Sequence, residues 1–539
     1  MAIIISQIKT TLDEPKDNAV AKALSLLRLS RAETASAKLY KSSVDARRDI
    51  CFVNSVYIAM KDPAKERRLA EKHQNVRLYE PGALSFTRGK ERLRGDVYVA
   101  GFGPAGMFCA LTLCEFGYRP VVLARCGARP ILLERGRAVE QRKQDVERFW
   151  HTGELDLTSN VQFGEGGAGT FSDGKLTTRI GDPLCSRVLE RLVEFGAPED
   201  ILTQAKPHIG TDKLRRVVKN LRSRVLELGG EVRFLSPLEN LELHSGRVDS
   251  IRVNGADIPC GVLALAVGHS AHDTFRMLHG KGLTLVPKPF SVGARIEHLQ
   301  ADIDRALYGK YAGHPALPPG EYQLSYHDNG RGVYTFCMCP GGYVVASASE
   351  PGTVVTNGMS YFDRAGKNAN SAVLVSVAPE DFGGGPLGGA EFIHRLEEKA
   401  YQLGRGGKAP TALTREFVSG GNSFTLGRVD PTYSLGVEPA DLNELFPEYV
   451  SQPMKNGLRY FDRRIPGFSD SDSVLTAIET RSSSPVRLPR NEAGSAECAD
   501  NLFPCGEGCG YAGGIMSAAV DGIKTAVRIM ERFAPAQAE

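Results

Sequence analysis

The chain has 539 residues, a formal net charge of +3 and 42% hydrophobic residues. A chain of this length is too long for one hydrophobic core, so we expect two or three globular domains. The balanced charge gives no reason to expect a nucleic acid or a membrane surface as partner. No stretch reaches the roughly 18 uninterrupted apolar residues of a membrane span.

The cysteines and the N-terminus bear on localisation. The 11 cysteines are an odd number, and the apolar run that follows Met1 is too short for a secretory signal. We therefore expect reduced thiols and a cytoplasmic protein.

Residues 1–92 lack any nucleotide-binding pattern and predict a separate α+β module, for which a ferredoxin-like fold is one candidate. The predicted elements are a helix at Val20–Leu29, a strand at Ile50–Met60, a charged helix at Asp62–Lys72 and a strand at Val76–Tyr79. The basic, turn-rich segment 81–94 that follows is typical of a linker.

The most informative segment is 96–116, where a short apolar strand ends in a Gly-x-Gly-x-x-Gly turn and a helix follows. In dinucleotide-binding folds the first glycine permits the tight turn, the second lets the backbone approach a pyrophosphate, and the third lets helix and strand pack closely. The N-terminus of the helix favours phosphates. The segment predicts a nucleotide cofactor held by Gly101, Gly103, Pro104, Ala105 and Gly106.

A tandem repeat follows, in which Gly117–Cys126 and Gly127–Gly136 have the same pattern. Either copy can supply the second strand of the fold, which should end near an acid that binds a ribose hydroxyl. Glu134 in the second copy has this chemistry, and we favour it as the ribose ligand. In the alternative the first copy is the cofactor strand, and Arg125 suits a 2′-phosphate.

Further along, the sequence predicts a doubly wound α/β domain interrupted by an insertion. Helix Thr211–Leu228 and strands between residues 231 and 267 continue the α/β pattern. Between 288 and 473 Gly and Pro are frequent and β-like runs dominate. We interpret 93–287 and 474–533 as a discontinuous Rossmann-like domain, and 288–473 as an inserted β-rich substrate domain.

Six more segments stand in the order Asn160–Leu176, Ala266–Ser270, Phe336–Gly342, Asn357–Ser360, Glu479–Arg487 and Gly506–Ile515. Together with the glycine turn they resemble a family of largely uncharacterised FAD-dependent dehydrogenases. Its members carry a small N-terminal domain before a glutathione-reductase-like FAD domain. The resemblance covers the chain from about Lys41 onward and implies FAD as the cofactor, whereas the tandem repeat departs from the family pattern.

Several residues of these segments are expected to contact FAD. The glycine-rich run 164–174 lets backbone N–H groups approach a flavin or a phosphate without obstruction. By resemblance, Glu507 lies beside the ribityl chain, and a second helix N-terminus at 513–515 stabilises negative charge on the flavin. The expected cofactor residues beyond the glycine turn are Glu134, Arg135, Gln162, Gly167, Gly169, Lys175, Gly268, Gly506, Glu507, Gly513, Gly514 and Ile515.

Two other glycine patterns are disfavoured as nucleotide sites. Gly169–Lys175 is close to the phosphate-binding loop of NTPases, but Leu176 stands where Ser or Thr must hold Mg²⁺. Gly383–Gly388 also has a Gly-x-Gly-x-x-Gly spacing, but it does not follow directly on a strand and predicts a linker.

The remaining candidates concern catalysis and metals. Cys337-x-Cys339 and Cys505-x3-Cys509 do not match a strong zinc or iron–sulfur spacing, so buried structural thiols are favoured over a metal site or a redox pair. No metal is expected, and His269 is left unassigned. Arg481, in a Ser-rich loop with Arg487, is a candidate clamp for an anionic substrate. Its alternative is a surface arginine paired with an acid.

These observations predict an FAD-dependent oxidoreductase of the dehydrogenase type that acts on an unidentified small molecule, with NAD(P)H as a candidate transient reductant. An FAD-dependent monooxygenase and a non-enzymatic flavoprotein or redox sensor are the alternatives. No nucleic acid or membrane partner is expected, and the sequence does not predict the oligomeric state.

Overall fold

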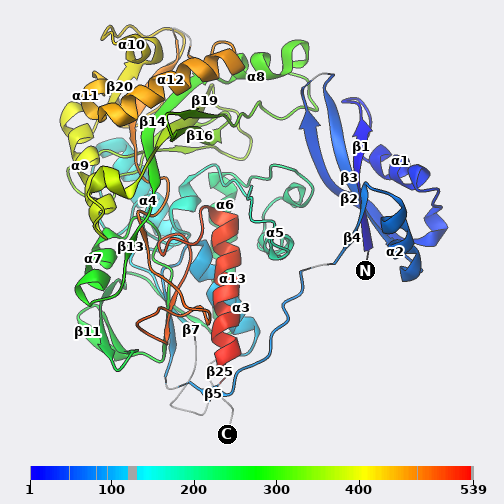
Figure 1. Cartoon of the computed structure of the whole chain (residues 1–539), viewed down its shortest axis with the longest axis horizontal. Helices are drawn as coiled ribbons and strands as arrows, with labels where there is room; N and C mark the ends of the chain where they lie inside the picture. Colours follow the sequence, from blue (N-terminus) through cyan, green and yellow to red (C-terminus); the bar gives the residue numbers. More distant parts are fainter. Residues whose placement is uncertain are drawn as a thin grey trace.

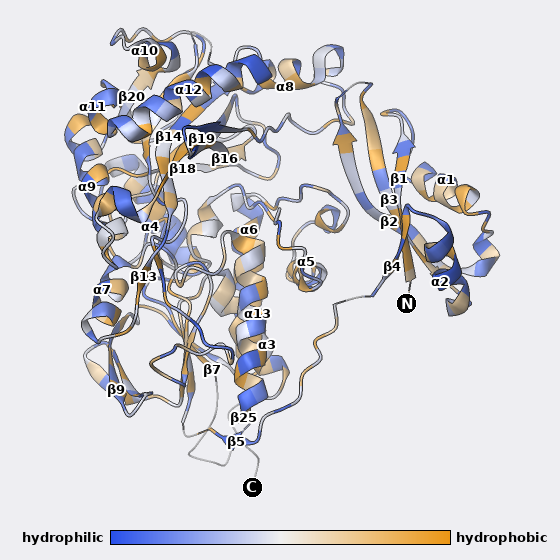
Figure 2. Ribbon diagram, in the orientation of Figure 1, coloured by the Kyte–Doolittle hydropathy of each residue, from blue (hydrophilic) through white to orange (hydrophobic). Residues whose placement is uncertain are grey.

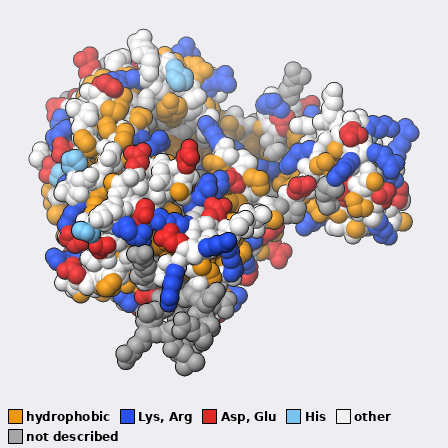
Figure 3. Space-filling model, turned by 60° about the horizontal axis from the view of Figure 1, so that its bottom comes forward, with side chains coloured by type: hydrophobic (Ala, Val, Ile, Leu, Met, Phe, Trp, Pro, Cys, Tyr) orange, Lys and Arg blue, Asp and Glu red, His pale blue; other side chains and the backbone are white. Residues whose placement is uncertain are grey.

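The computed structural model describes residues 2–47, 49–80, 82–93, 95–118, 130–469 and 472–535. These residues form a small N-terminal unit, which stands to one side, and a larger body built on a parallel and a mainly antiparallel sheet (Figure 1). Within this part of the chain no helix combines the length and apolar character that crossing a membrane requires. Basic and acidic side chains are interspersed over the face of the body shown in Figure 3.

The N-terminal unit is a four-stranded antiparallel sheet with two helices on one face. Its elements are β1 (Ala2–Thr10), α1 (Asn18–Leu26), β2 (Thr34–Asp45), β3 (Cys51–Met60), α2 (Pro63–Lys72) and β4 (Val76–Tyr79). The strands lie in the order β2-β3-β1-β4. Alternate residues of β1 and β3 point to the helices and bury a core with α1. The unit meets the body where the Ser42 N–H donates to the Thr203 carbonyl and the Ser42 carbonyl accepts from the Ala205 N–H.

The first part of the body is a five-stranded parallel sheet in the order β24-β12-β6-β7-β8. Its strands are β6 (Val97–Ala100), β7 (Pro130–Leu133), β8 (Glu231–Arg233), β12 (Val262–Leu265) and β24 (Leu502–Pro504). Every residue of β6, β7 and β12 is buried, because helices cover one face and a three-stranded meander covers the other. The helices are α3 (Pro104–Glu115), α5 (Leu184–Glu194), α6 (Thr211–Glu227) and α13 (Ile515–Arg532). The other face holds β9 (Leu238–His244), β10 (Arg247–Val253), β11 (Ala256–Pro259) and α7 (His272–Gly280).

The second copy of the tandem repeat supplies β7, which pairs with β6 so that Pro130 lies opposite Val97. Residues 119–129, including Arg125, lie outside the described residues. The extended segment after the N-terminal unit ends in β5 (Glu91–Arg92), which pairs with β25 (Phe533–Ala534) at the end of α13. Along the ribbon of α13 in Figure 2 hydrophilic and hydrophobic residues alternate, as expected for a helix with one buried face.

The second part of the body is a seven-stranded sheet in the order β15-β16-β19-β14-β22-β20-β21. The strands are β14 (Phe290–Leu299), β15 (Ser325–Asp328), β16 (Arg331–Cys339), β19 (Asn368–Val377), β20 (Ala409–Leu413), β21 (Val437–Pro439) and β22 (Val474–Glu479). Its helices are α8 (Gln300–Tyr308), α9 (Gly388–Leu403), α10 (Thr414–Ser419), α11 (Leu442–Leu445) and α12 (Glu448–Arg464). A small ribbon of β17 (Tyr343–Ala346) and β18 (Thr356–Met359) lies beside it, and β13 (Val286–Pro287) pairs with β23 (Val486–Arg487) where the two parts join.

Two expectations about this second part are corrected. The residues from Val474 to Glu479 do not return to the parallel sheet but form β22, which pairs with β14 and β20. All six of these residues are buried, and a fully buried apolar strand carries no local mark of which sheet it joins. The region is also mixed rather than mainly β, because α9 and α12 supply much of its hydrophobic core.

Candidate functional site

A cleft opens at the carboxyl edge of the parallel sheet and extends to the seven-stranded sheet; its empty volume of about 1570 Å³ includes open solvent at the mouth. Its lining runs from Glu134 at the end of β7 to Phe336 in β16, so the cleft spans both parts of the body. The ends of β6, β7 and β12 and the segment after β24 all contribute to its wall. The chain order reverses at β6, and ligands of open α/β sheets bind at such a switch point.

The glycine turn after β6 is as compact as its pattern predicts. Gly101 has φ +105°, and a Cβ there would lie 2.2 Å from the Ala266 carbonyl oxygen. A Cβ on Gly106 would lie 1.9 Å from the Gly101 oxygen. Gly103 faces Gly167 so closely that a Cβ on Gly167 would lie 3.1 Å from the Gly103 Cα. Gly167, with φ +63°, has little room for a Cβ, whereas a Cβ on Gly103 would lie 3.8 Å from the Gly167 Cα, an ordinary contact distance.

Two helices begin at the cleft. The N-terminal residues of α3, Pro104 and Ala105, and those of α13, Gly514 and Ile515, line it, and the two helices pack side by side (Figure 1). A helix N-terminus presents free N–H groups and the positive end of its dipole, and two of them at one cleft favour an anionic ligand.

Glu134 stands at the end of β7 and is 4% exposed. Its carboxylate accepts hydrogen bonds from the Phe102 N–H at 2.9 Å and the Gly136 N–H at 2.8 Å. The side chain therefore joins the end of β7 to the glycine turn after β6, and it also lines the cleft. Its assignment as a ribose ligand stays a prediction.

The glycine-rich segment is shaped by Arg142, a residue of α4 (Val139–Thr152) that sequence reasoning missed. Its guanidinium is fully buried and donates to five backbone carbonyls, those of Asn160, Val161, Gly164, Glu165 and Gly167. It also stacks 4.9 Å from the centre of the Phe171 ring. The sequence does not reveal such a role for an arginine in a charged helix, because its partners are backbone carbonyls, which every residue has whatever its side chain.

Lys175 lies in the wall of the cleft, but its charge is already matched. Its Nζ donates to Asp173 at 3.0 Å and to the Met338 carbonyl. Asp173 also receives both arms of Arg364, at 3.1 and 2.6 Å. Through this cluster the parallel-sheet part is joined to the seven-stranded part.

Arg481 does not offer a free bidentate face, which corrects the expectation of a bidentate substrate clamp. Its Nε and Nη2 donate to the buried Glu397 at 2.6 and 2.7 Å, and Nη2 also donates to Glu350 at 3.1 Å. Nη1 is buried without a partner, and the residue lines the cleft. The long sequence separations of 84 and 131 residues hid these partners from sequence reasoning.

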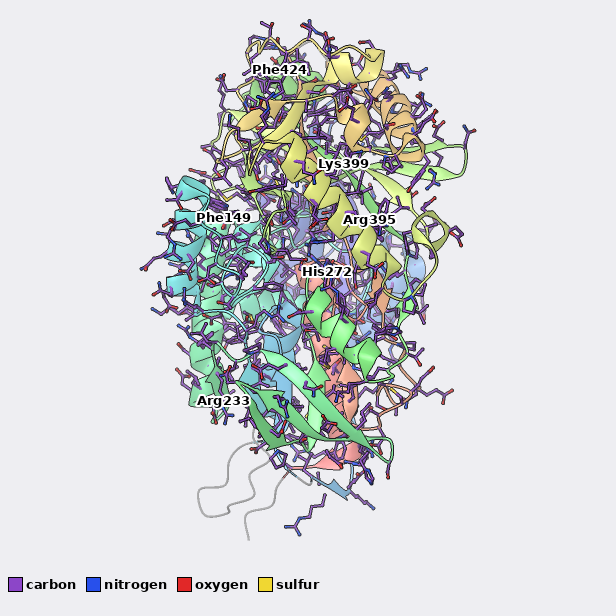
Figure 4. All side chains as sticks on the ribbon, turned by 90° about the vertical axis from the view of Figure 1, so that its left-hand side faces the viewer. Phe149, Arg233, His272, Arg395, Lys399 and Phe424 are labelled. Atoms are coloured by element: carbon purple, nitrogen blue, oxygen red, sulfur yellow. The ribbon has the colours of Figure 1, made fainter. Side chains whose placement is uncertain are left out.

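Two histidines complete this ionic cluster. His272 Nδ1 lies 3.0 Å from Glu350, and His394 Nδ1 lies 3.1 Å from the other oxygen of the same carboxylate. Figure 4 shows His272 between the lower and upper parts of the body, near the residues of α9. Glu350, His394 and Glu397 bring possible ligand atoms within 4.8 Å of one another, but both carboxylates already bind Arg481, so the arrangement needs no metal ion.

Among the titratable groups that line the cleft, Glu507 and His269 have strongly shifted pKa values. Burial raises the pKa of Glu507 to about 7, although it accepts a hydrogen bond from the Gly514 N–H and lies near Lys288. Burial, with the nearby Arg481 and His272, lowers the pKa of His269 to about 3. The His269 ring is therefore neutral at physiological pH.

A hydrogen-bond chain sets the tautomer of His269. Gln162 Nε2 donates to Ser347 Oγ at 2.6 Å, which turns its Oε1 to accept from the Ser270 hydroxyl at 3.0 Å. The Ser270 hydroxyl has one proton and uses it there, so His269 Nδ1, 2.9 Å away, is the donor to Ser270. Nε2 then carries the lone pair.

Most of the predicted cofactor residues meet at the cleft. Those that line it are Gly101, Gly103, Pro104, Ala105, Glu134, Arg135, Gln162, Gly167, Gly169, Lys175, Gly268, Glu507, Gly514 and Ile515. Gly106, Gly506 and Gly513 do not. Gly106 packs on the Gly101 carbonyl, and a Cβ on Gly506 would lie 2.7 Å from that of Ala105, so these two glycines serve packing of the strand ends and α3.

Other lining residues were not among the expected cofactor residues. Ser236 and Thr274 lie outside every segment singled out in the sequence, whereas Phe163, Phe336, Asn357, Glu479 and Ser482 belong to the segments that carry the family resemblance. Of the cysteines, Cys339, Cys505 and Cys509 are buried as expected. Cys337 is exposed and lines the cleft, so its assignment as a buried thiol is wrong. Gly383–Gly388 precedes α9 and does not line the cleft.

Comparison with known proteins identifies a family. An uncharacterized protein of Clostridium beijerinckii is 46% identical over 542 residues, which cover 99% of each chain. The present chain belongs to the same family. Residues 289–482, the seven-stranded part with β22 included, match the family described as "FAD-dependent protein, C-terminal domain-like". This match again places the end of the second part after β22.

Solved structures resemble the chain only loosely. The crystal structure of CtdE in complex with FAD covers 82% of this chain and 87% of its own at 10% identity and TM-score 0.31. A geranylgeranyl bacteriochlorophyll reductase-like protein of Thermoplasma acidophilum covers 80% and 78% at 12% identity and TM-score 0.32. The halogenase PltM covers 81% and 68% at 12% identity and TM-score 0.36. At such TM-scores no residue is transferred from them.

Proposed function

We propose that the protein binds FAD in the cleft and acts as an FAD-dependent oxidoreductase. The observation that carries the proposal is the position of the cleft at the switch point of the parallel sheet, where two helix N-termini meet. The spread of its lining over both parts of the body, and the match of residues 289–482 to a family of FAD-dependent proteins, support FAD over a smaller nucleotide. No finding supports NAD(P)H as a second cofactor.

The backbone of the cleft fits this ligand. Gly268, with φ +79°, and Gly514, with φ +92°, have nothing within 4 Å of the position a Cβ would take. Gly103 and Gly167 form a wall of bare backbone that admits a pyrophosphate. In this assignment the α3 N-terminus holds the pyrophosphate, Glu134 the adenosine ribose, and the α13 N-terminus the flavin end.

Bound FAD would supply hydride and electron transfer, and the chain supplies position and electrostatics. The positive end of the α13 dipole stabilises negative charge at its N-terminus. Glu507 beside it has a pKa of about 7 because it is buried, so near neutral pH it holds or releases a proton there. The substrate side is the end of the cleft lined by Phe336, Asn357 and Ser482 from the seven-stranded part. We assign a small-molecule substrate to this end of the cleft.

Flavin analysis and one variant test the proposal. Purified protein should release one equivalent of FAD on denaturation, and FMN or the absence of flavin after incubation with FAD would refute it. Glu134→Gln should weaken FAD binding by about 1–3 kcal/mol, because a charge-assisted bond to ribose becomes a neutral one and one of the two backbone N–H groups loses its acceptor. Glu140→Gln, on the exposed side of α4, is the matched control.

The same proposal assigns the remaining parts. The N-terminal unit has the βαββαβ order of a ferredoxin-like module, and we assign it to that class. The parallel-sheet part is the FAD domain and the seven-stranded part the substrate domain. The ten described cysteines are all free thiols, which is compatible with a cytoplasmic location.

A further inference from the structure

Glu479, the last residue of β22, is a buried carboxylate for which the proposed function has no role. It is 5% exposed and lines the cleft. It belongs to the substrate side, because Ser482 follows three residues later in the chain. Its partner Arg295 also packs against Gly358, next to Asn357, where a Cβ would lie 2.5 Å from Arg295 Nη2.

One oxygen of the Glu479 carboxylate is fixed by Arg295, which is fully buried. Arg295 Nη1 donates to Glu479 Oε2 at 2.8 Å. Its Nε donates to Asn370 at 2.9 Å, and its Nη2 donates to the Cys337 carbonyl at 2.7 Å. Each nitrogen of the guanidinium thus has a partner of its own, and the carboxylate is held in one orientation.

The other oxygen, Oε1, faces the cleft. It accepts no hydrogen bond from the described residues, and it is not one of their enclosed polar atoms without a partner. Burial raises the pKa of Glu479, with Arg295 acting in the opposite direction. A carboxylate oxygen at so buried a position needs a donor. A ligand that displaces water from this end of the cleft must therefore supply one.

The cationic side chains that line the cleft do not supply this donor, because acids already match them. None of them forms an ion pair with Glu479 within the described part of the chain. They are Arg135, Lys175 and Arg481, which pair with Asp273, Asp173 and Glu397 respectively.

The ionic cluster around Arg481 adds negative charge to this end of the cleft. The single guanidinium is shared by Glu397 and Glu350, and the pKa of Glu350 is lowered to about 2 despite its burial, by His272 and Arg481. Burial and Arg481 lower the pKa of His272, so its ring stays neutral. A proton on His394 would be matched by its second acidic neighbour. The excess carboxylate favours a cationic ligand group over an anionic one.

We propose that Glu479 Oε1 binds the amino group of the substrate, and that the substrate is therefore an amine. Aliphatic amines, like the lysine side chain, are protonated at neutral pH, and an ammonium donates a charge-assisted hydrogen bond to a carboxylate. The apolar remainder of the substrate can lie on Phe336, which is 45% exposed. That the bound amine is the substrate rests on the proposed function, whereas its binding to Glu479 does not.

Calorimetry on the holoprotein tests the chemical class of the ligand. The probes are butylamine with 1-butanol and benzylamine with benzyl alcohol, so that an amine is compared with an alcohol of the same shape. We expect each amine to bind at least about tenfold more tightly than its alcohol, as a charge-assisted hydrogen bond exceeds a neutral one. No preference for the amine in either pair would overturn the proposal.

Two variants test whether the preference comes from Glu479. Glu479→Gln keeps a carbonyl oxygen for Arg295 but presents an NH₂ group to the cleft, so the advantage of the amines should disappear. Glu297→Gln is the matched control, because Glu297 is a fully buried carboxylate of β14 that does not line the cleft, and it should keep the advantage. A folded Glu479→Gln protein that still prefers the amines would overturn the assignment.

Glu479→Asp gives a second test that does not depend on the folding of Glu479→Gln. The shorter side chain keeps its charge but cannot both bind Arg295 and reach the ligand as Glu479 does. The amines should therefore bind more weakly than to the wild type, while the alcohols bind as before. Unchanged affinity for the amines in Glu479→Asp would count against Glu479 as their ligand.

The flavin content of the same proteins separates this inference from the proposed function. Both Glu479 variants should retain FAD. A folded variant that loses FAD would show that Oε1 serves the cofactor, and the proposal would fail. A wild-type protein without FAD would refute the proposed function, and calorimetry would still decide whether Glu479 binds an amine.

Discussion

Replacement of Arg142 should impair ligand binding in the cleft, although Arg142 itself does not line the cleft. Arg142→Met keeps the apolar stem of the side chain but removes every donor to the carbonyls of residues 160–167. Each of the five bonds involves a charged donor and is worth about 1.5–3 kcal/mol in isolation. In the unfolded wild-type chain the Arg142 guanidinium is hydrated by water, and folding removes that hydration. The sum of the five bond energies therefore overstates the loss of stability in the variant. We expect a net loss of about 3–5 kcal/mol, as when one partner of a buried ionic site is removed.

The loss should appear in cofactor binding as well as in stability. The five carbonyls belong to the segment whose Gln162, Gly164 and Gly167 line the cleft, so an ordered segment is needed for binding. We expect Arg142→Met to weaken FAD binding at least about 100-fold, which corresponds to roughly 2.7 kcal/mol. Arg142→Lys should lie between wild type and Arg142→Met, because an ammonium has three donors and cannot serve five carbonyls.

The assay is titration of apoprotein with FAD, followed by flavin fluorescence, together with thermal unfolding of the apoprotein. Arg148→Met is the matched control, since Arg148 lies on the same helix with its side chain 46% exposed and paired only with Asp145 in the described structure. An unchanged dissociation constant and melting temperature in Arg142→Met would show that residues 160–167 keep their shape without the guanidinium, and the reasoning would fail.

Three further predictions concern the cleft and its surroundings. Gly268→Ala should weaken FAD binding, whereas Gly246→Ala should not. Both glycines have φ near +75° to +79° and open space at the Cβ position, but of the two only Gly268 lines the cleft. Equal FAD affinities of the two variants would argue against the proposed site. Because burial raises the pKa of Glu507 from 4.5 to about 7, the folded protein keeps a proton there that the unfolded chain has lost, so this group should make folding less favourable as pH rises from about 4.5 to 7. Glu507→Gln should remove that part of the dependence of the melting temperature on pH, and parallel curves would contradict the shift. Arg481→Met should destabilise the protein by about 3–5 kcal/mol, since it leaves the buried Glu397 unpaired, and adding Glu397→Gln should recover part of the loss in a denaturant titration; no recovery would mean that the pair is not the cause.

The strand, glycine turn and helix of residues 96–116 follow from the local sequence. The spacing of Gly101, Gly103 and Gly106 depends on backbone sterics within a few residues, and the structure forms the strand, turn and helix where this pattern stands. The same holds for α6 and for the short strands after it, whose apolar periodicity is local. The choice between the two repeat copies was open in the sequence, and β7 shows that the second copy pairs with β6.

The partners of buried groups could be assigned from the folded chain alone. β22 joins the seven-stranded sheet, Arg481 is paired with Glu397, and Arg142 binds carbonyls. In each case the partner lies far along the chain or is a backbone atom, so no nearby residue type records it. The exposure of Cys337 could not be predicted either. It accompanies a β-bulge between β16 and β19, and the Cys337 carbonyl there accepts a hydrogen bond from Arg295 Nη2. Local patterns report the conformations that neighbouring residues allow, whereas burial and pairing depend on which distant segments pack together, and that is a property of the whole chain.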